Sequence, residues 1–224
     1  MDFTALSLTI RLAAQSTLLL LLLTMPLAAW LAAGTGITRR VVQAAVALPM
    51  VLPPTVLGFY LLTGLGPATA FGRAIIVLLG HPLAFTFPGI VFGSMLYSLP
   101  FAVQPLTAAF DAVPHALTDT ARVLGASPFT VFRRVTLPLA KSGILTAAVL
   151  TFAHTVGEFG VVLMLGGDIP GKTQTLSVSI YDKVQEGNYA AANTMSLWLL
   201  AASFLALLAV YLRSDVLRRR PKLG

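Results

Sequence analysis

The sequence contains no cysteine, so the chain can form no disulfide, no thiolate metal site and no cysteine nucleophile. Charged residues are also scarce: they make up 10% of the 224 residues, whereas an ordinary soluble domain has roughly 25%. Hydrophobic residues make up 57%. A soluble fold of this size could not hide so much apolar surface from water. Long apolar runs alternate with short polar segments throughout the sequence, which predicts a single transmembrane domain over residues 1–224.

Five apolar runs have the length of a membrane-spanning helix. A bilayer core about 30 Å thick needs roughly 20 helical residues. The predicted spans are residues 12–33, 41–65, 83–110, 142–165 and 189–212. None of them shows the two-residue alternation of a membrane barrel strand. We therefore predict an all-α integral membrane protein with about five transmembrane helices.

The distribution of basic residues predicts the orientation in the membrane. The formal net charge is +7, and lysine and arginine favour the cytoplasmic side of a membrane. An external N-terminus and a cytoplasmic C-terminus place most of them in the cytoplasm: Arg39, Arg40, Arg122, Arg133, Arg134, Lys141, Arg213, Arg218, Arg219, Arg220 and Lys222. Residues 67–82 are too short for a sixth span, so we expect an external or re-entrant segment there. Basic residues placed between apolar runs favour a lipid bilayer over nucleic acid as the partner.

The second predicted span contains three prolines within six residues, at Pro49, Pro53 and Pro54. Each proline removes a helical hydrogen bond, so we expect a kink or an unwound turn. Unpaired backbone groups are tolerated in a membrane only where they face protein or a water-filled path. Kinks that serve packing alone are the alternative. The residues expected to line a translocation path are Pro53, Pro54, Thr55, Thr151 and Thr155.

Residues 111–138 form the longest predicted cytoplasmic loop, and they carry their own helix signals. Pro114 suits the first turn of a helix, and Gly125 suits the left-handed position just past its end. Ser127, followed by a proline, predicts the start of a second short helix that runs to about Arg134. Thr136 precedes a Leu-Pro pair and repeats that signal where the fourth span is expected to begin.

The first loop helix has a narrow apolar stripe formed by Leu117, Ala121 and Leu124, which are spaced at i, i+4 and i+7. Asp119 and Arg122 lie off this stripe. Such a face either docks into a groove of a partner protein or packs on the chain's own helices. The residues alone leave both alternatives open.

The loop resembles the EAA loop of ABC-importer permeases. The family pattern is Glu-Ala-Ala, three residues, Gly, nine residues, Ile-x-Leu-Pro. This chain has Asp119-Thr120-Ala121, three residues, Gly125, nine residues and Val135-Thr136-Leu137-Pro138. The spacing matches throughout, and the deviations are Asp for Glu, Thr for the first Ala and Val for Ile.

The resemblance implies that the chain is the permease subunit of an ABC importer and not an enzyme. ATP and magnesium would be used by a separate cytoplasmic ABC ATPase dimer, and this chain would bind no cofactor. The loop would couple ATPase closure to movement of the spans. The residues that match the coupling role are Leu117, Asp119, Thr120, Ala121, Leu124, Gly125, Leu137 and Pro138.

Three further segments, residues 48–58, 152–160 and 169–175, resemble molybdate permeases. This resemblance implies import of molybdate or tungstate through the bacterial inner membrane, by a homodimer that works with an external oxyanion-binding protein. Sulfate permeases share much of the segment around Gly157 and Glu158, so import of sulfate or another oxyanion is the alternative. An ion-coupled secondary transporter would need a coupling-ion site, and only one acidic residue lies within the spans.

His154 and Glu158 lie at i and i+4, on one face of the fourth span. Two ligands are too few for a zinc site, so we predict no metal centre. Because a charged group in the membrane is costly unless it faces the protein interior, we expect this pair to make structural hydrogen bonds at the dimer or bundle interface.

Overall fold

The computed structural model describes residues 2–218, which are helical almost throughout and contain no strand. The helices are α1 (Phe3–Ala32), α2 (Ile37–Val51), α3 (Pro54–Gly64), α4 (Ala70–Leu79), α5 (Phe87–Asp111), α6 (His115–Val123), α7 (Pro128–Val131), a π-helical turn (Phe132–Thr136), α8 (Leu137–Leu139), α9 (Lys141–Val156), α10 (Gly160–Gly166), α11 (Leu176–Gln185) and α12 (Tyr189–Arg218). The predicted all-α fold class is confirmed.

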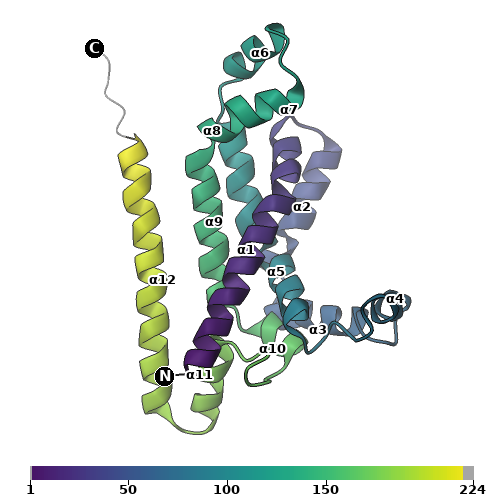
Figure 1. The fold of residues 1–224 in the computed structure, drawn as a ribbon, viewed down its shortest axis with the longest axis vertical. Helices are drawn as coiled ribbons and strands as arrows, with labels where there is room; N and C mark the ends of the chain where they lie inside the picture. The colour runs from purple at the N-terminus through teal and green to yellow at the C-terminus, as the bar shows by residue number, and fades with distance from the viewer. Residues whose placement is uncertain (1, 219–224) are drawn as a thin grey trace.

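The centre of the molecule is formed by α1, α5 and α9, which pack on one another along most of their length (Figure 1). Two apolar clusters hold them together: one is centred on Leu12 and Ile90, and the other on Leu106 and Phe110. Helix α1 begins nine residues earlier than the predicted span 12–33, at Phe3. Its start is fixed by the side chain of Asp2, which accepts hydrogen bonds from the backbone N–H groups of the first turn.

The predicted span 41–65 is not one helix. It consists of α2 and α3, whose axes differ by 108°. Leu52 and Pro53 both have extended backbone angles, with ψ of 136° and 135°. Each of these residues precedes a proline, and the proline ring disfavours the helical conformation in the residue before it. Pro54 then occupies the first turn of α3, where its missing N–H costs nothing. The expected kink is therefore a complete break.

The predicted span 142–165 is also interrupted. Helix α9 ends at Val156, and the chain passes through Gly157, Glu158 and Phe159 before α10 begins. The predicted span 83–110 corresponds to α5, which begins at Phe87, and span 189–212 lies within α12. The sequence is apolar on both sides of each interruption, so hydropathy alone did not separate the pieces.

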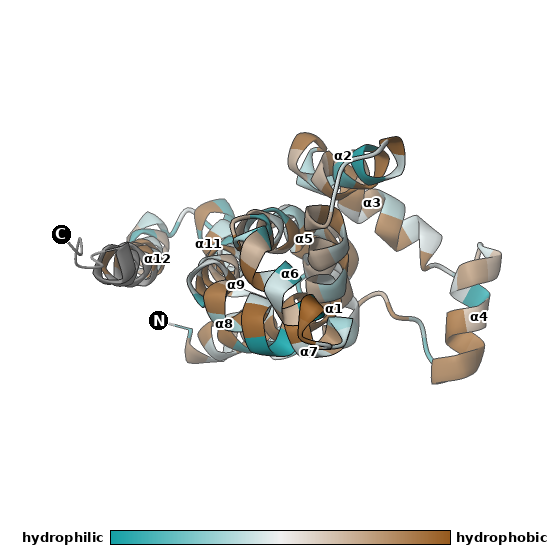
Figure 2. Cartoon of the chain, turned by 90° about the horizontal axis from the view of Figure 1, so that it is seen from above, coloured by the Kyte–Doolittle hydropathy of each residue, from teal (hydrophilic) through white to brown (hydrophobic). Residues whose placement is uncertain are grey.

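The stretch 67–82 contains α4, a ten-residue helix capped at its start by the Thr69 hydroxyl and ended by Gly80. Its length is about 15 Å, too short to cross a bilayer core. Helix α4 projects away from the bundle beyond α3 in both views (Figures 1 and 2). No sixth span forms within this part of the chain, in agreement with the prediction.

Among the residues that the structure describes, two helices, α1 and α5, are long and apolar enough to cross a membrane as single helices, and there are up to four such spans if each bent pair counts as one. In addition, α12 has an apolar stretch over Tyr189–Leu205. Arg219, Arg220 and Lys222 of the predicted basic tail lie outside the described residues.

Candidate functional site

Helix α6 lies at one end of the molecule, beyond the ends of α5 and α9 (Figure 1). Gly125 follows two residues after the last residue of this helix, Val123, and its φ of +82° is the left-handed conformation that favours glycine. The N–H of Gly125 donates to the Arg122 carbonyl at 2.9 Å, and the N–H of Ala126 donates to the Ala121 carbonyl at 3.0 Å. The predicted end of the first loop helix is therefore confirmed.

No residue of α6 is buried. Leu117 is 48% exposed and Leu124 is 81% exposed, and Ala121 between them is partly exposed. This exposure argues against the alternative that α6 packs on its own bundle. Val123 and Phe129 are also strongly exposed, at 87% and 70%. The sequence reasoning missed these two side chains because it followed only the i, i+4, i+7 stripe.

The second half of the loop differs from the prediction at one point. Ser127 caps α7 as expected, because its hydroxyl accepts from the N–H of Thr130 at 3.3 Å. Thr136, however, caps nothing: its backbone angles are helical, and it lies inside a continuous run from Pro128 to Leu139. A π-helical turn precedes Pro138, and its wider hydrogen-bonding pattern admits the proline without ending the helix. The chain bends by 73° after this run, and the fourth span begins at Lys141.

The other residues matched to the coupling role lie near this bend or on α6. Leu137 packs against the apolar cluster around Leu106, and Pro138 is exposed. Asp119 forms an ion pair with Arg122 at 3.0 Å, and both side chains are more than half exposed. An exposed pair of this kind contributes little to stability. Thr120 donates to the carbonyl of Ala116 at 2.7 Å. Contact of these residues with an ATPase remains a prediction.

The two helix breaks contact each other, although Pro53 and Thr55 are themselves exposed. Helix α3 packs directly on α10. A Cβ atom built on Gly160 would lie 2.8 Å from the Cβ of Pro54, closer than side chains normally approach. The break that contains Pro53, Pro54 and Thr55 is therefore in contact with the start of α10. Irregular backbone from two different spans gathers at one place, and a membrane protein tolerates such backbone where it is buried in protein or lines a water-filled space. Lining of a translocation path by these residues remains a prediction.

Thr151 and Thr155, predicted to line the same path, are fully buried. The hydroxyl of Thr155 donates to the Thr151 carbonyl at 2.9 Å and lies 3.0 Å from the hydroxyl of Ser98 on α5. The Ser98 hydroxyl is also 2.9 Å from Nδ1 of His154, whose ring stacks on Phe101 at 4.0 Å. These contacts join α9 to α5, and this is the structural hydrogen-bonding role predicted for His154.

Glu158 lies in the break between α9 and α10, and it is only 4% exposed. Neither of its carboxylate oxygens has a hydrogen-bond partner among the described residues. The expected position of Glu158 in the protein interior is confirmed. The hydrogen bonds expected for its carboxylate are not formed with any of residues 2–218. Within residues 2–218, no group of three or more His, Asp or Glu side chains is close enough to hold a metal ion.

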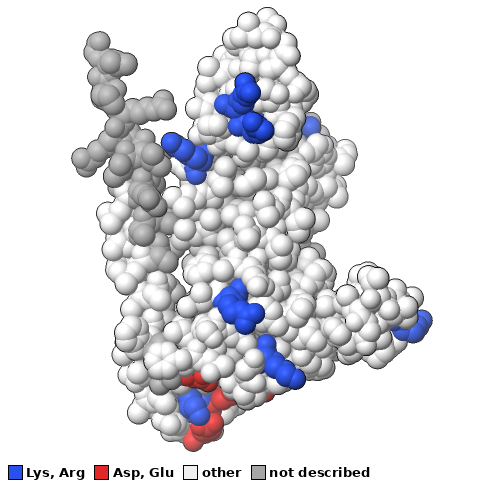
Figure 3. Space-filling view, viewed as in Figure 1, with Lys and Arg blue, Asp and Glu red and all other residues white. Residues whose placement is uncertain are grey.

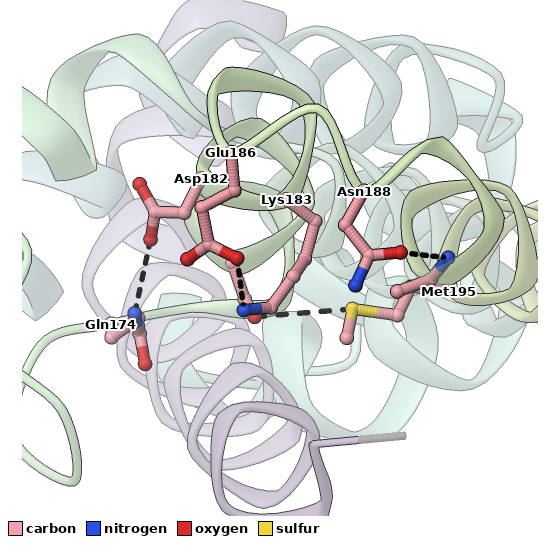
Figure 4. Close-up of polar contacts among 8 residues, drawn as sticks. Gln174, Asp182, Lys183, Glu186, Asn188 and Met195 are labelled. Atoms are coloured by element: carbon pink, nitrogen blue, oxygen red, sulfur yellow. Dashed lines mark hydrogen bonds and ion pairs between the residues drawn. The ribbon is translucent and has the colours of Figure 1, made fainter.

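The opposite end of the molecule is held by polar contacts around α11 (Figure 4). The side-chain amide of Gln174 donates to Asp182 at 3.1 Å, and Lys183 pairs with Glu186 at 2.7 Å. Partial burial, together with the nearby Asp168 carboxyl, raises the pKa of Asp182 above its ordinary value. The Gln174–Asp182 contact connects the loop after α10 to α11, whereas the Lys183–Glu186 pair lies at the end of α11 itself.

Residues 24–221 match the family of binding-protein-dependent transport system inner membrane components. A molybdenum transport system permease protein from Azotobacter vinelandii is 49% identical over 210 residues, which cover 94% of this chain and 93% of the relative. A protein of the same description from Mycobacterium tuberculosis is 37% identical over 214 residues, covering 95% of this chain and 80% of the relative.

Among solved structures, a chain of a bacterial alginate ABC transporter, crystallised with a periplasmic protein that carries an alginate pentasaccharide, superimposes with a TM-score of 0.72. The match covers 99% of this chain and 80% of that chain, at 22% sequence identity. At this identity the likeness concerns the fold alone.

Proposed function

Because this chain belongs to the family of binding-protein-dependent transport system inner membrane components, we propose that it is the permease subunit of an ATP-driven importer of molybdate. The observation that supports molybdate as the substrate is the 49% identity to a molybdenum transport permease over 94% of the chain. Tungstate, a tetrahedral dianion like molybdate, is the expected second substrate.

The proposed division of labour follows from the geometry of α6. An exposed apolar helix at one end of the molecule offers a docking surface for a separate ATPase subunit. Helix α6 is followed by the continuous Pro128–Leu139 run, which bends directly into α9. A force applied to α6 therefore reaches α9, and through it the break at Gly157. ATP hydrolysis belongs to the partner subunit, and this chain binds no cofactor.

The proposed assembly contains two copies of this chain, two ATPase subunits and an external oxyanion-binding protein. The surface of α3 and α4 is evidence for the second copy of this chain, since these helices extend from the bundle with large apolar side chains exposed. Phe59, Tyr60, Phe71, Val77 and Leu78 are each at least half exposed. A second protomer would cover part of this surface, and lipid would cover the remainder.

The function is tested by uptake of labelled molybdate at low concentration in cells with and without this gene. We expect uptake to fall to background in the deletion strain and to return when the gene is supplied. Unlabelled tungstate should compete, and sulfate should compete little. Uptake unaffected by the deletion, or blocked mainly by sulfate, would assign the chain to another oxyanion.

The proposed orientation places α6 in the cytoplasm and the N-terminus outside. Basic side chains appear at both ends of the face shown in Figure 3, whereas acidic side chains are seen on this face only at the α11 end. The basic side chains at the end that carries α7 to α9, without acidic neighbours in this view, support the orientation, because basic residues favour the cytoplasmic side. Since the native chain has no cysteine, the variant Thr130→Cys reports on one position only. We expect it to resist an impermeant thiol reagent added to intact cells and to react in inside-out vesicles. Labelling in intact cells would reverse the orientation.

A further inference from the structure

A cavity of about 870 Å³ lies between the end of α1, the middle of α2 and the last part of α5. Its volume is many times the roughly 30 Å³ that one water molecule occupies in the liquid. Its polar lining includes Gln43 from α2 and Gln104 and Thr107 from α5. Asp111 and His115 line it at the end nearest α6.

The two glutamines reach this cavity from different helices. Gln43 lies six residues after the start of α2, and Gln104 lies seven residues before the end of α5. At 1.5 Å per residue, each is about 10 Å inside the end of its helix. Both side chains are exposed in the protomer. An amide group turned toward lipid tails would lose its hydrogen bonds at a cost of several kcal/mol, so the convergence of two amides indicates that water fills this space.

The hydrogen-bonding capacity of both amides is largely free. The side-chain nitrogen of Gln104 has one contact, with the sulfur of Met50 at 3.5 Å, and a thioether is a weak acceptor. Gln43 forms no side-chain hydrogen bond with the described residues. In contrast, the Thr107 hydroxyl already donates to the Val103 carbonyl at 2.8 Å. The amide N–H groups of the two glutamines are therefore the donors that this wall can offer to a solute.

We propose that this cavity is the inner half of the oxyanion path, and that the Gln43 and Gln104 amides are the groups that the anion passes on its way to the α6 side. This inference rests on the proposed function. Amide N–H groups can replace part of the hydration of a tetrahedral dianion without holding it by net charge. Conduction requires this balance, because a site that binds too strongly does not release its ion. No lysine or arginine is among the residues that line the cavity, and the carboxylate of Asp111 stands only at its exit toward α6, past the two amides.

Accessibility to a water-soluble reagent tests the path without reference to the substrate. In the assembled complex, Gln104→Cys and Gln43→Cys are treated with a charged thiol reagent from the α6 side. The control is Leu23→Cys on α1, nine residues before the end of that helix, which is 65% exposed and lies outside the cavity lining. We expect the two cavity positions to react at least about tenfold faster than the control, because a thiol ionises readily only in contact with water. Equal rates would overturn the proposal even if molybdate uptake is normal.

A change of charge tests the role of the amide in transport. Gln104→Glu keeps the shape of the side chain and adds a negative charge to the path. We expect it to lower molybdate uptake by about tenfold or more, through repulsion of the dianion, while ATP hydrolysis by the complex continues. Gln185→Glu makes the same change on α11, outside the cavity, and should leave uptake unchanged. Normal uptake by Gln104→Glu would contradict the assignment, whereas absence of uptake by the unmodified chain would refute the proposed function instead.

Discussion

Replacement of Gly125 by valine is expected to abolish ATP-dependent uptake while the protein remains inserted in the membrane. Gly125 has a φ of +82°, and no atom lies within 4 Å of the position that a Cβ would occupy. The effect of the substitution is therefore confined to the backbone. The left-handed conformation costs a residue with a side chain about 1–2 kcal/mol, and a β-branched residue such as valine adopts it least readily. The turn would rearrange, and α6 would lose its fixed position relative to α7.

Gly187→Val is the matched control for this experiment. Gly187 has a φ of +74° and equally open surroundings, and it ends α11 with the same pair of backbone hydrogen bonds, from Gly187 to Val184 and from Asn188 to Lys183. The two variants therefore carry a similar local strain at opposite ends of the molecule. Uptake and membrane content are measured for both. We expect loss of uptake in Gly125→Val alone. Normal uptake in that variant, or equal loss in both, would remove the coupling role from this loop.

Replacement of Gly143 by leucine is expected to prevent correct folding of the bundle. Gly143 lies on α9 where it crosses α5, and a Cβ built on it would overlap the Cβ of Ala109 and lie 3.3 Å from the Ala109 Cα. Because the obstacle includes backbone, the side chain cannot be accommodated by a change of rotamer, and the two helices must separate. Overpacking of this kind costs about 1–3 kcal/mol or more. The contact between α5 and α9 is part of the central bundle, so no neighbouring element can take its place.

The yield of monodisperse protein in detergent and the temperature of its unfolding measure this effect. Gly64→Leu is the control, since Gly64 is also helical but has open space where the side chain would lie. Gly143→Ala should fall between the native chain and Gly143→Leu, because it adds a single methyl group at the same contact. A Gly143→Leu protein with native yield and stability would show that the close approach of α5 and α9 is not required.

The sequence predicted those features that depend on local chemistry. Long apolar runs located the main helices, and Gly125 located the end of α6, because only a glycine is comfortable in that turn. The same rules failed at Thr136, where the Thr-Leu-Pro order looks like a cap but a π-helical turn carries the helix past the proline. They also failed at the break after Val156, since the residues on both sides are equally apolar.

Features that depend on contacts between distant segments could not be predicted from the chain alone. The approach of Pro54 to Gly160 joins two helix breaks about a hundred residues apart in sequence. Gln43 and Gln104 are single amides within apolar helices, and neither has a local pattern that marks it. Their common cavity appears only when α2 and α5 are placed side by side.

Transport of labelled molybdate into proteoliposomes shows whether this chain imports the anion with energy from ATP. The vesicles contain this chain with its ATPase partner, and the oxyanion-binding protein is added on the side opposite the ATPase. We predict that molybdate accumulates only when ATP is available to the ATPase, and that omission of this chain, the ATPase or the binding protein abolishes accumulation. Uptake by this chain alone, driven by an ion gradient without ATP, would contradict the account and identify a secondary transporter instead.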